Sequence, residues 1–87
     1  MFEWDEQKSD LNFTKHGLDF NLAIEVFSDP RAMMQFNRCK DKEDRYHVIG
    51  SLQGELIIVL VVFTLRKEKI RIISARKANK KERAIYG

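Results

Sequence analysis

The residues best suited to chemistry lie close together near the end of the chain. Arg76 and Lys77 follow a segment rich in isoleucine, and the polar cluster continues through Lys80, Lys81, Glu82, Arg83 and Tyr86. An arginine guanidinium can bind a phosphate through two parallel hydrogen bonds and keeps its charge at any useful pH. Fixed cations also stabilise the negative charge that a phosphate gains while it is being cleaved. The cluster predicts a phosphate-binding surface led by Arg76, and the alternative for each lysine is solvated surface charge.

Three side chains are candidates for proton transfer or for contact with a base. Glu82 is either a helix-capping residue, a general base, or a group that orients a nearby arginine. His47 shares a predicted strand face with Arg45 and is either an acid–base group or a structural residue. Tyr86 follows Glu82 by four residues on one helical face, and either stacks on a base or packs at the chain end. The residues alone leave these alternatives open and do not establish catalysis.

Positive charge is concentrated in the last quarter of the chain. Residues 1–65 hold seven Lys/Arg and eleven Asp/Glu, a net charge of −4, whereas residues 66–87 hold nine and two, a net charge of +7. A concentrated positive potential attracts polyanions, and nucleic acid is the usual one. Charge therefore favours a nucleic-acid partner, although a solvated charged face without specific function is the alternative.

The sequence also argues against several other classes. Neither His16 nor His47 has a second His or Cys at ligand spacing, and no Walker or GxGxxG loop is present, so we expect no metal and no cofactor. The single Cys39 is interpreted as an incidental thiol in a reducing compartment. The longest apolar run, residues 56–63, is too short to span a bilayer, and the acidic first residues lack the apolar core of a signal peptide. These features predict a cytoplasmic location without membrane contact.

Helix-capping residues and hydrophobic periodicity predict the helices and strands that must position the C-terminal polar cluster. The 87 residues, without repeats or linker, predict a single domain spanning 1–87. Asp5 and Asp19 are predicted to cap helices over residues 8–16, ended by Gly17, and 20–27, ended by Ser28-Asp29-Pro30. The second helix carries an apolar stripe formed by Phe20, Ala23, Ile24 and Phe27.

The remainder of the chain predicts strands and one short helix. Strands are expected at residues 2–4, 32–36, 45–51, 56–63 and 69–75, with a loop at 38–43, a turn at Gly54 and a connection at 65–68. Alternation in the last strand places Ile70, Ile72 and Ser74 on one face and Arg71 and Ile73 on the other. A helix over residues 80–86 begins at Asn79 in a capping box. This order favours an α+β fold, with the N-terminal helices packed on a curved antiparallel sheet and a short C-terminal helix.

Taken together, these motifs resemble the BrnT toxin family over residues 2–86. The resemblance rests on Phe2-Glu3-Trp4-Asp5, Lys8, Lys15-His16-Gly17, Ala23, Val26-Phe27, Asp29-Pro30, Arg45-Tyr46, Ile49-Gly50, Thr64, the stretch from Ile70 to Ala78, Glu82-Arg83 and Tyr86. It implies a type II toxin with a RelE-like fold that cleaves RNA and arrests growth. It also implies a BrnA-like ribbon-helix-helix antitoxin as partner, through which the complex binds operator DNA and represses its own operon.

The same resemblance carries over eight candidate site residues by position: Arg45, Thr64, Arg66, Arg71, Ser74, Arg76, Glu82 and Arg83. The C-terminal cluster adds Lys77, Lys80, Lys81 and Tyr86. The catalytic candidates are Arg76, Arg66, Glu82, Arg45 and Thr64, and the RNA-binding candidates are Arg71, Ser74, Lys77, Lys80, Lys81, Arg83 and Tyr86. In the resulting hypothesis, RNA is cleaved without metal by its own 2′-hydroxyl, and Arg76 and Arg66 together hold the phosphate. No metal ligand is assigned.

The sequence departs from the family pattern at the hairpin after Thr64. Leu65 stands where members often have glutamate, Lys67-Glu68 replaces the usual glycine, and Val62 occupies a position that often carries His or Tyr. These departures keep two alternatives open: a non-catalytic nucleic-acid-binding module, or a decayed toxin that acts as a transcriptional co-repressor with its antitoxin.

Overall fold

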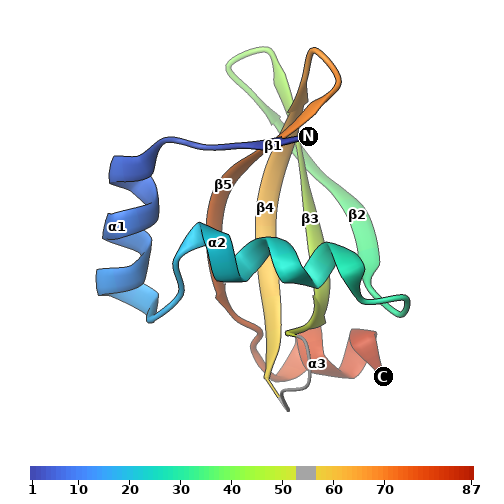
Figure 1. The fold of residues 1–87 in the computed structure, drawn as a ribbon. Coiled ribbons are helices and arrows are strands. Elements are labelled where there is room, and N and C mark those ends of the chain that lie inside the picture. The colour runs from blue at the N-terminus through green and yellow to red at the C-terminus, as the bar shows by residue number, and fades with distance from the viewer. Residues whose placement is uncertain (53–56) are drawn as a thin grey trace.

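A computed structural model describes residues 1–52 and 57–87 of the chain (Figure 1). The elements follow one another as β1 (Phe2–Glu3), α1 (Glu6–His16), α2 (Phe20–Ala23), the 3₁₀ helix η1 (Ile24–Ser28), β2 (Met33–Lys40), β3 (Glu43–Ser51), β4 (Ile58–Arg66), β5 (Lys69–Lys77) and α3 (Lys80–Tyr86). The α+β class is thus confirmed. The predicted turn at Gly54 lies outside the described residues.

The five strands form one sheet in the order β1-β5-β4-β3-β2. Strands β2 to β5 pair antiparallel, but β1 pairs parallel with β5, so the predicted purely antiparallel sheet is corrected to a mixed one. Although residue 56 lies outside the described residues, the apolar strand predicted at residues 56–63 corresponds to β4, which lies between β3 and β5 in the sheet. Its interior residues Val59, Val61 and Phe63 are buried.

The helix α2 and its continuation η1 cross one face of the sheet (Figure 1). The predicted single helix over residues 20–27 is corrected, because the chain tightens into a 3₁₀ helix at Ile24. A 3₁₀ helix has three residues per turn, so Val26 of η1 lies one turn after Ala23, and Phe20, Ala23 and Val26 are all 0% exposed. The predicted Ile24 and Phe27 are only partly buried against the same core.

The close approach of η1 to the sheet requires a glycine at position 50. A Cβ atom on Gly50 in β3 would lie 2.5 Å from Cγ2 of Val26, which is closer than two carbon atoms can approach. Gly50 therefore allows η1 to lie directly on β3.

The helix α1 lies beside β5 and docks through polar side chains (Figure 1). Asn12 is buried, and its Nδ2 donates to the carbonyl oxygens of Leu18 at 2.7 Å and Ala75 at 2.8 Å, while its Oδ1 accepts from Ala75 N at 3.1 Å. Ser9 is also buried, and its Oγ accepts from Phe20 N. The apolar Leu11 of α1 is 68% exposed.

Both hairpins close with two-residue turns whose residues have positive φ. Asp41 and Lys42 connect β2 to β3, and Lys67 and Glu68 connect β4 to β5, with φ between 46° and 69°. Such turns match the twist of the strands but favour Asn or Gly. The predicted loop 38–43 and connection 65–68 are therefore both corrected to tight turns, with the strands running up to them.

Register shifts interrupt the alternation in two strands. In β5, Val62 pairs with Ser74 and the next residue, Phe63, pairs with Ile72, so Ile73 is the extra residue of a bulge. In β2, a shift lies between Phe36 and Arg38. The predicted faces of β5 are therefore wrong beyond Ile72: Ile70, Ile72 and Ala75 share the core face, and Arg71, Ser74 and Arg76 share the other.

Within the described ranges, no helix is both long and apolar enough to cross a membrane.

We expect the Asn12→Ala variant to lose about 2 kcal/mol of unfolding free energy, because three backbone groups lose a buried partner. Urea unfolding of the variant beside Thr14→Ala, which removes a hydrogen bond on the exposed side of α1, measures the difference. Equal losses in the two variants would contradict a special role for Asn12.

Replacing Glu68 by glycine should stabilise the protein by about 1 kcal/mol, because an L-residue at φ 69° is disfavoured and glycine is not. The thermal midpoint of Glu68→Gly should rise, whereas that of Lys69→Gly, within β5, should fall. A fall in both would show that the turn is not strained.

Candidate nucleic-acid interface

The sheet face opposite α2 carries half of the predicted site residues, and we call it the polar face. Because paired residues lie on the same side of a sheet, the register defines its rows. One row crosses Arg38, Arg45, Thr64, Arg71 and Glu3, the next crosses Gln35, His47, Val62 and Ser74, and the third crosses Met33, Ile49, Leu60 and Arg76. Arginines therefore lie in the first and third rows, with His47 and Ser74 between them.

The third row ends at a bidentate ion pair. Arg76 Nη1 and Nη2 donate to the two carboxylate oxygens of Glu82 at 2.7 and 2.9 Å. Nη1 also donates to the carbonyl oxygen of Lys77 at 3.2 Å. Within the described part of the chain, Arg76 Nε has no acceptor, so the edge formed by Nε and Nη2 keeps its donors for another group. Because the guanidinium group is planar, the two hydrogen bonds to Glu82 on one edge also fix the direction of the donors on the opposite edge.

Glu82 is held in its charged form. The hydrogen bonds from Arg76 lower the pKa of Glu82, burial opposes this, and the backbone N–H of Asn79 adds to the lowering. The same pair raises the pKa of Arg76 above its ordinary value. Glu82 closes the predicted capping box with Asn79 and orients Arg76 as well, so two of its interpretations apply together. A carboxylate with a lowered pKa and both oxygens engaged is a poor proton acceptor.

Arg66 lies at the opposite end of the sheet. It pairs with Lys69 beside the hairpin turn, its Nε donates to Oε2 of Glu43 at 2.9 Å, and its Nη2 lies 2.8 Å from the same oxygen in an ion pair. Arg76 pairs with Leu60, six residues along β4 from Arg66. Six residues of a strand span about 20 Å. The prediction that Arg66 and Arg76 hold one phosphate together is therefore wrong.

The first row is more enclosed. Thr64 is 1% exposed, and its hydroxyl donates to the carbonyl oxygen of Asp44 at 2.7 Å, so it joins β4 to β3. Arg71 binds Glu3 at 3.3 Å, and Arg45 lies 3.9 Å from Glu43. The Nε atom of Arg45 is buried and has no hydrogen-bond partner among the described residues. Arg45 is thus a cation with an unused donor on the polar face.

The middle row brings a histidine to the centre of the polar face. His47 Nε2 lies 3.0 Å from Oε1 of Gln35, on the neighbouring β2. Ser74 reaches this row only because of the bulge at Ile73. The register confirms that Arg45, His47 and Ile49 share a face. Gln35 was missed from the sequence because nothing in its local pattern distinguishes it from a solvated glutamine.

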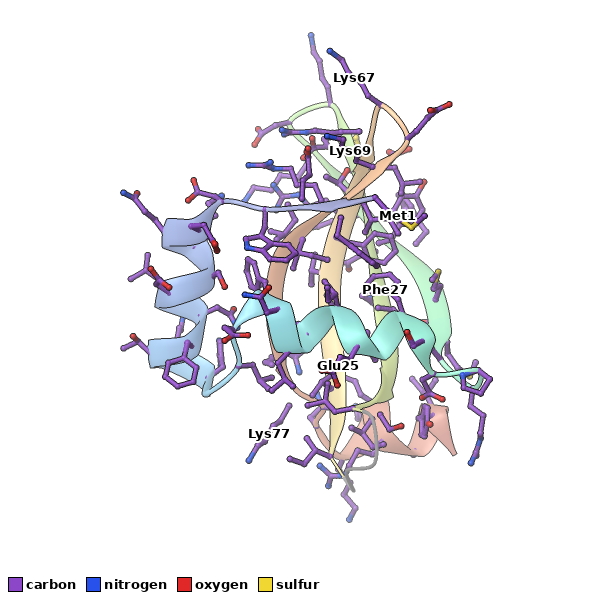
Figure 2. The ribbon with its side chains drawn as sticks, in the orientation of Figure 1. Met1, Glu25, Phe27, Lys67, Lys69 and Lys77 are labelled. Atoms are coloured by element: carbon purple, nitrogen blue, oxygen red, sulfur yellow. The ribbon has the colours of Figure 1, made fainter. Side chains whose placement is uncertain are left out.

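The predicted lysines are distributed around the end of the sheet. Lys77 pairs with Val59, which places it on the core side, and Figure 2 shows it at the end of the sheet opposite Lys67 and Lys69. Lys80 and Lys81 are exposed in the first turn of α3. Arg83 donates to the carbonyl oxygen of Ala78 at 2.9 Å. Among the described cations at the α3 end of the sheet, Arg76 alone is held in a bidentate ion pair.

Asp29 is a residue whose role the sequence did not predict. Its carboxylate accepts from Tyr86 Oη at 2.6 Å, from Ser51 N at 2.9 Å and from Arg31 N at 3.0 Å. The guanidinium of Arg31 lies 5.3 Å from the centre of the Tyr86 ring. Tyr86 therefore packs at the chain end in this structure, which was one of its two interpretations. The Asp-Pro dipeptide predicts only the local turn to Arg31.

These contacts fasten α3 to the sheet. Within the described ranges, α3 has no buried residue, so its position depends on polar contacts near its two ends, Glu82 with Arg76 and Tyr86 with Asp29. The apolar Ile49 and Leu60 of the third row are buried at the end of the sheet where α3 contacts β3. Asp29 thus acts on the site indirectly, by holding the helix that carries Glu82.

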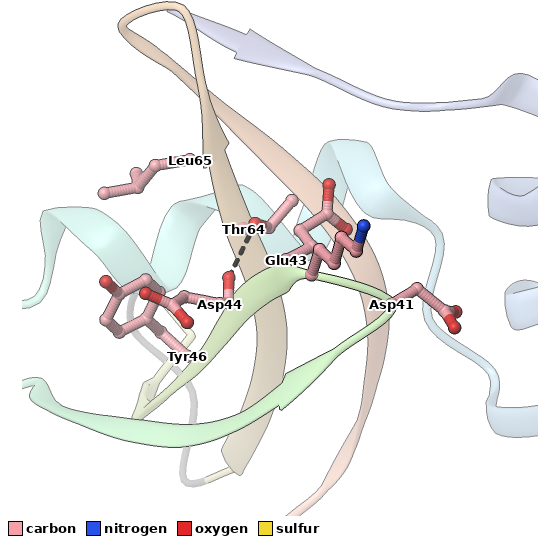
Figure 3. Close-up of a pocket in the computed structure, with 7 residues that line it drawn as sticks. Asp41, Glu43, Asp44, Tyr46, Thr64 and Leu65 are labelled. Carbon is pink, nitrogen blue, oxygen red and sulfur yellow. Dashed lines mark hydrogen bonds between the residues drawn. The ribbon is translucent and has the colours of Figure 1, made fainter.

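A polar hollow lies away from this end. It measures about 410 Å³ and is formed at the hairpin turns, where Asp44, Tyr46 and Leu65 line one side (Figure 3). Its carboxylates from Asp41, Glu43 and Asp44 would repel a phosphate. Leu65, which stands where family members often have glutamate, therefore lines this hollow. It lies on the core side of β4 and not on the polar face with Arg76.

We expect the contribution of Asp29 to stability to depend on pH. Burial raises the pKa of Asp29, but the hydrogen bonds from Ser51, Tyr86 and Arg31 outweigh it and lower the pKa from 3.8 to about 2. Because the folded-state pKa is the lower one, the stabilisation is present above about pH 4 and disappears as the pH falls towards 2.

The variant Asp29→Asn should therefore lose about 1 kcal/mol at pH 7, after allowance for screening of a partly exposed group. Its unfolding free energy should approach that of the native chain near pH 2. Urea titrations at several pH values, with Asp10→Asn as the control for loss of an exposed carboxylate, measure this convergence. A difference that is constant with pH would contradict the role of the charge.

Comparison with known proteins identifies the family of the chain. No curated protein matches the chain. The family model of BrnT, described as the ribonuclease toxin of a type II toxin–antitoxin system, matches residues 4–82. This match covers α1, strands β2 to β5 and the start of α3, including Arg76 and Glu82. The chain therefore belongs to the BrnT family of type II ribonuclease toxins.

Proposed function

We propose that this chain cleaves RNA on its polar face, with Arg76 as the principal contact to the scissile phosphate. The observation that supports this most strongly is the bidentate pair with Glu82. It fixes the plane of the Arg76 guanidinium and leaves the edge formed by Nε and Nη2 without a described acceptor. An edge of this kind matches two oxygens of a phosphate. Glu82 acts here as a positioning residue.

The proposed reaction needs no metal. The 2′-hydroxyl of the RNA attacks the neighbouring phosphorus, a 2′-O–P bond forms, and the bond from phosphorus to the 5′ oxygen breaks. One proton leaves the 2′-hydroxyl and one reaches the departing 5′ oxygen. His47 is favoured for proton transfer, because an imidazole both accepts and donates protons and because Glu82 is held in its charged form.

The other arginines of the polar face have a supporting role in this proposal. Arg45 and Arg71 lie in the first row, about four residues of strand from Arg76, which corresponds to about 13 Å. They cannot contact the same phosphate as Arg76, so we assign them to flanking phosphates of the strand. The exposed cations of α3 add to the attraction of RNA. A RelE-like fold, a ribbon-helix-helix antitoxin and binding to operator DNA through it are parts of the same proposal.

A purified-protein assay tests the assignment of Arg76. The rate of cleavage of a labelled RNA by Arg76→Ala should fall at least about 100-fold, as for loss of one donor to a developing charge. The variant Lys8→Ala removes one exposed cation on α1 and should keep the native rate within about twofold. Unchanged cleavage by a folded Arg76→Ala protein would sink the assignment.

Adding Arg66→Ala distinguishes the corrected geometry from the original hypothesis. Because Arg66 and Arg76 lie about 20 Å apart, their effects on the rate should be independent, so the double variant should show their product. A double variant no worse than Arg76→Ala alone would instead indicate that both act on one phosphate.

The alternatives correspond to other outcomes of this assay. A chain that shifts or protects RNA in stoichiometric amounts, without turnover, is a binding module. A soluble chain that neither cleaves RNA nor arrests bacterial growth on induction, yet joins an antitoxin on DNA, is a decayed toxin with a co-repressor role.

A further inference from the structure

The outer edge of the sheet at β2 is open and chemically two-sided. β2 is the last strand in the sheet order, and all eight of its residues are exposed. An edge strand presents unpaired backbone donors and acceptors, and proteins usually blunt such an edge when nothing pairs with it. Here, however, Met34 is 58% exposed and Phe36 is 59% exposed. A long edge strand with an exposed apolar side is typical of a surface that receives another strand.

An apolar groove adjoins this edge on the core side of the sheet. It measures about 420 Å³ and is lined by Met34, Gln35, Phe36, Tyr46, Phe63, Leu65 and Ile70. Leu65 is 56% exposed. Apart from the amide of Gln35 and the hydroxyl of Tyr46, these side chains are apolar, so the groove suits aliphatic or aromatic side chains.

The opposite side of the same strand is basic. The register shift between Phe36 and Arg38 turns Arg38 and Lys40 to the polar face, where they pair with Arg45 and Glu43. β2 has no acidic residue, and no ion pair within the described residues involves Arg38 or Lys40. A strand lying beside β2 would therefore place alternate side chains against an apolar groove and against two cations.

We propose that the β2 edge binds an extended segment of the antitoxin as an added strand, in which apolar residues facing the groove alternate with acidic residues facing Arg38 and Lys40. Charge complementarity selects this occupant. A second copy of the chain would bring the same two cations and no anion to the edge, and like charges opposite one another are destabilising. The link to an antitoxin rests on the family role, whereas the chemistry of the segment rests on β2 itself.

The position of the edge also gives a route to inhibition, and this part rests on the proposed function. Arg38 lies in the row that continues through Arg45 to Arg71. Acidic side chains bound at Arg38 would compete with RNA phosphates for this end of the polar face, because both ligands are anions. The segment would thereby reduce RNA binding without reaching Arg76.

A synthetic peptide tests the surface with the intact chain. The probe is a dye-labelled peptide of about eight residues in which valine and glutamate alternate, and its binding is followed by fluorescence anisotropy. A peptide of the same composition, with the valines and glutamates in two blocks, is the first control. A peptide N-methylated only at the amides that would face β2 is the second. We expect the alternating peptide to bind and both controls to bind at least about tenfold more weakly.

Variants of the exposed surface sharpen the test. Phe36→Ser should weaken binding at least about tenfold, whereas Leu11→Ser, which alters an equally exposed apolar residue on α1, should not. The double variant Arg38→Glu, Lys40→Glu should lose the glutamate peptide and bind one in which valine alternates with lysine. Both positions are exposed, so these variants should fold.

Several results would overturn the proposal. These are equal binding of the blocked or N-methylated peptide, an equal effect of Leu11→Ser, or a chain that dimerises through β2 and does not bind the peptide. Peptide binding is measured without RNA, so the two proposals fail separately. Loss of RNA cleavage with intact peptide binding would count against the proposed function alone, and the reverse against the docking surface alone.

Discussion

A single extra residue in β5 decides on which side of the sheet Arg76 lies. Side chains alternate along a strand, so without the bulge Arg76 would follow Ile70 and Ile72 towards the core. An unpaired guanidinium is costly to bury there. The bulge at Ile73 turns Arg76 to the polar face, and the shift in β2 does the same for Arg38. The basic character of this face thus depends on two local breaks in pairing.

The polar face and α3 stabilise each other. α3 is short, with no buried residue in the described ranges, so a hydrophobic contact is not its main attachment. Glu82 joins its first turn to Arg76, and Tyr86 joins its last turn to Asp29. The helix fixes the guanidinium, and the guanidinium fixes the helix. Loosening α3 at Asp29 would therefore reach Arg76 through the helix, although Asp29 lies at the end of η1 and not on the polar face.

How far the sequence could predict this structure depends on the range of each interaction. Caps act within a few residues, so Asp5, Gly17, Asp19 and Asn79 were assigned correctly. The central β4 was found because its apolar run is continuous. The bulge at Ile73 left no local signal, and strict alternation gave the wrong face for Ser74. The docking of α1 through Asn12 is polar and joins residues 63 apart, so no hydrophobic pattern could indicate it.

The two sides of β2 suggest how a basic toxin could bind RNA and also be inhibited by a protein segment. In our proposal the polar face attracts RNA phosphates, and it would attract carboxylates for the same electrostatic reason, so charge alone would discriminate weakly between the two ligands. The apolar groove behind β2 supplies what RNA lacks, because a phosphodiester chain offers no aliphatic side chains to fill it. A protein segment that uses both sides of the strand gains apolar burial in addition to the ion pairs. Such a segment can displace RNA from the Arg38–Arg45 end while Arg76 stays paired with Glu82.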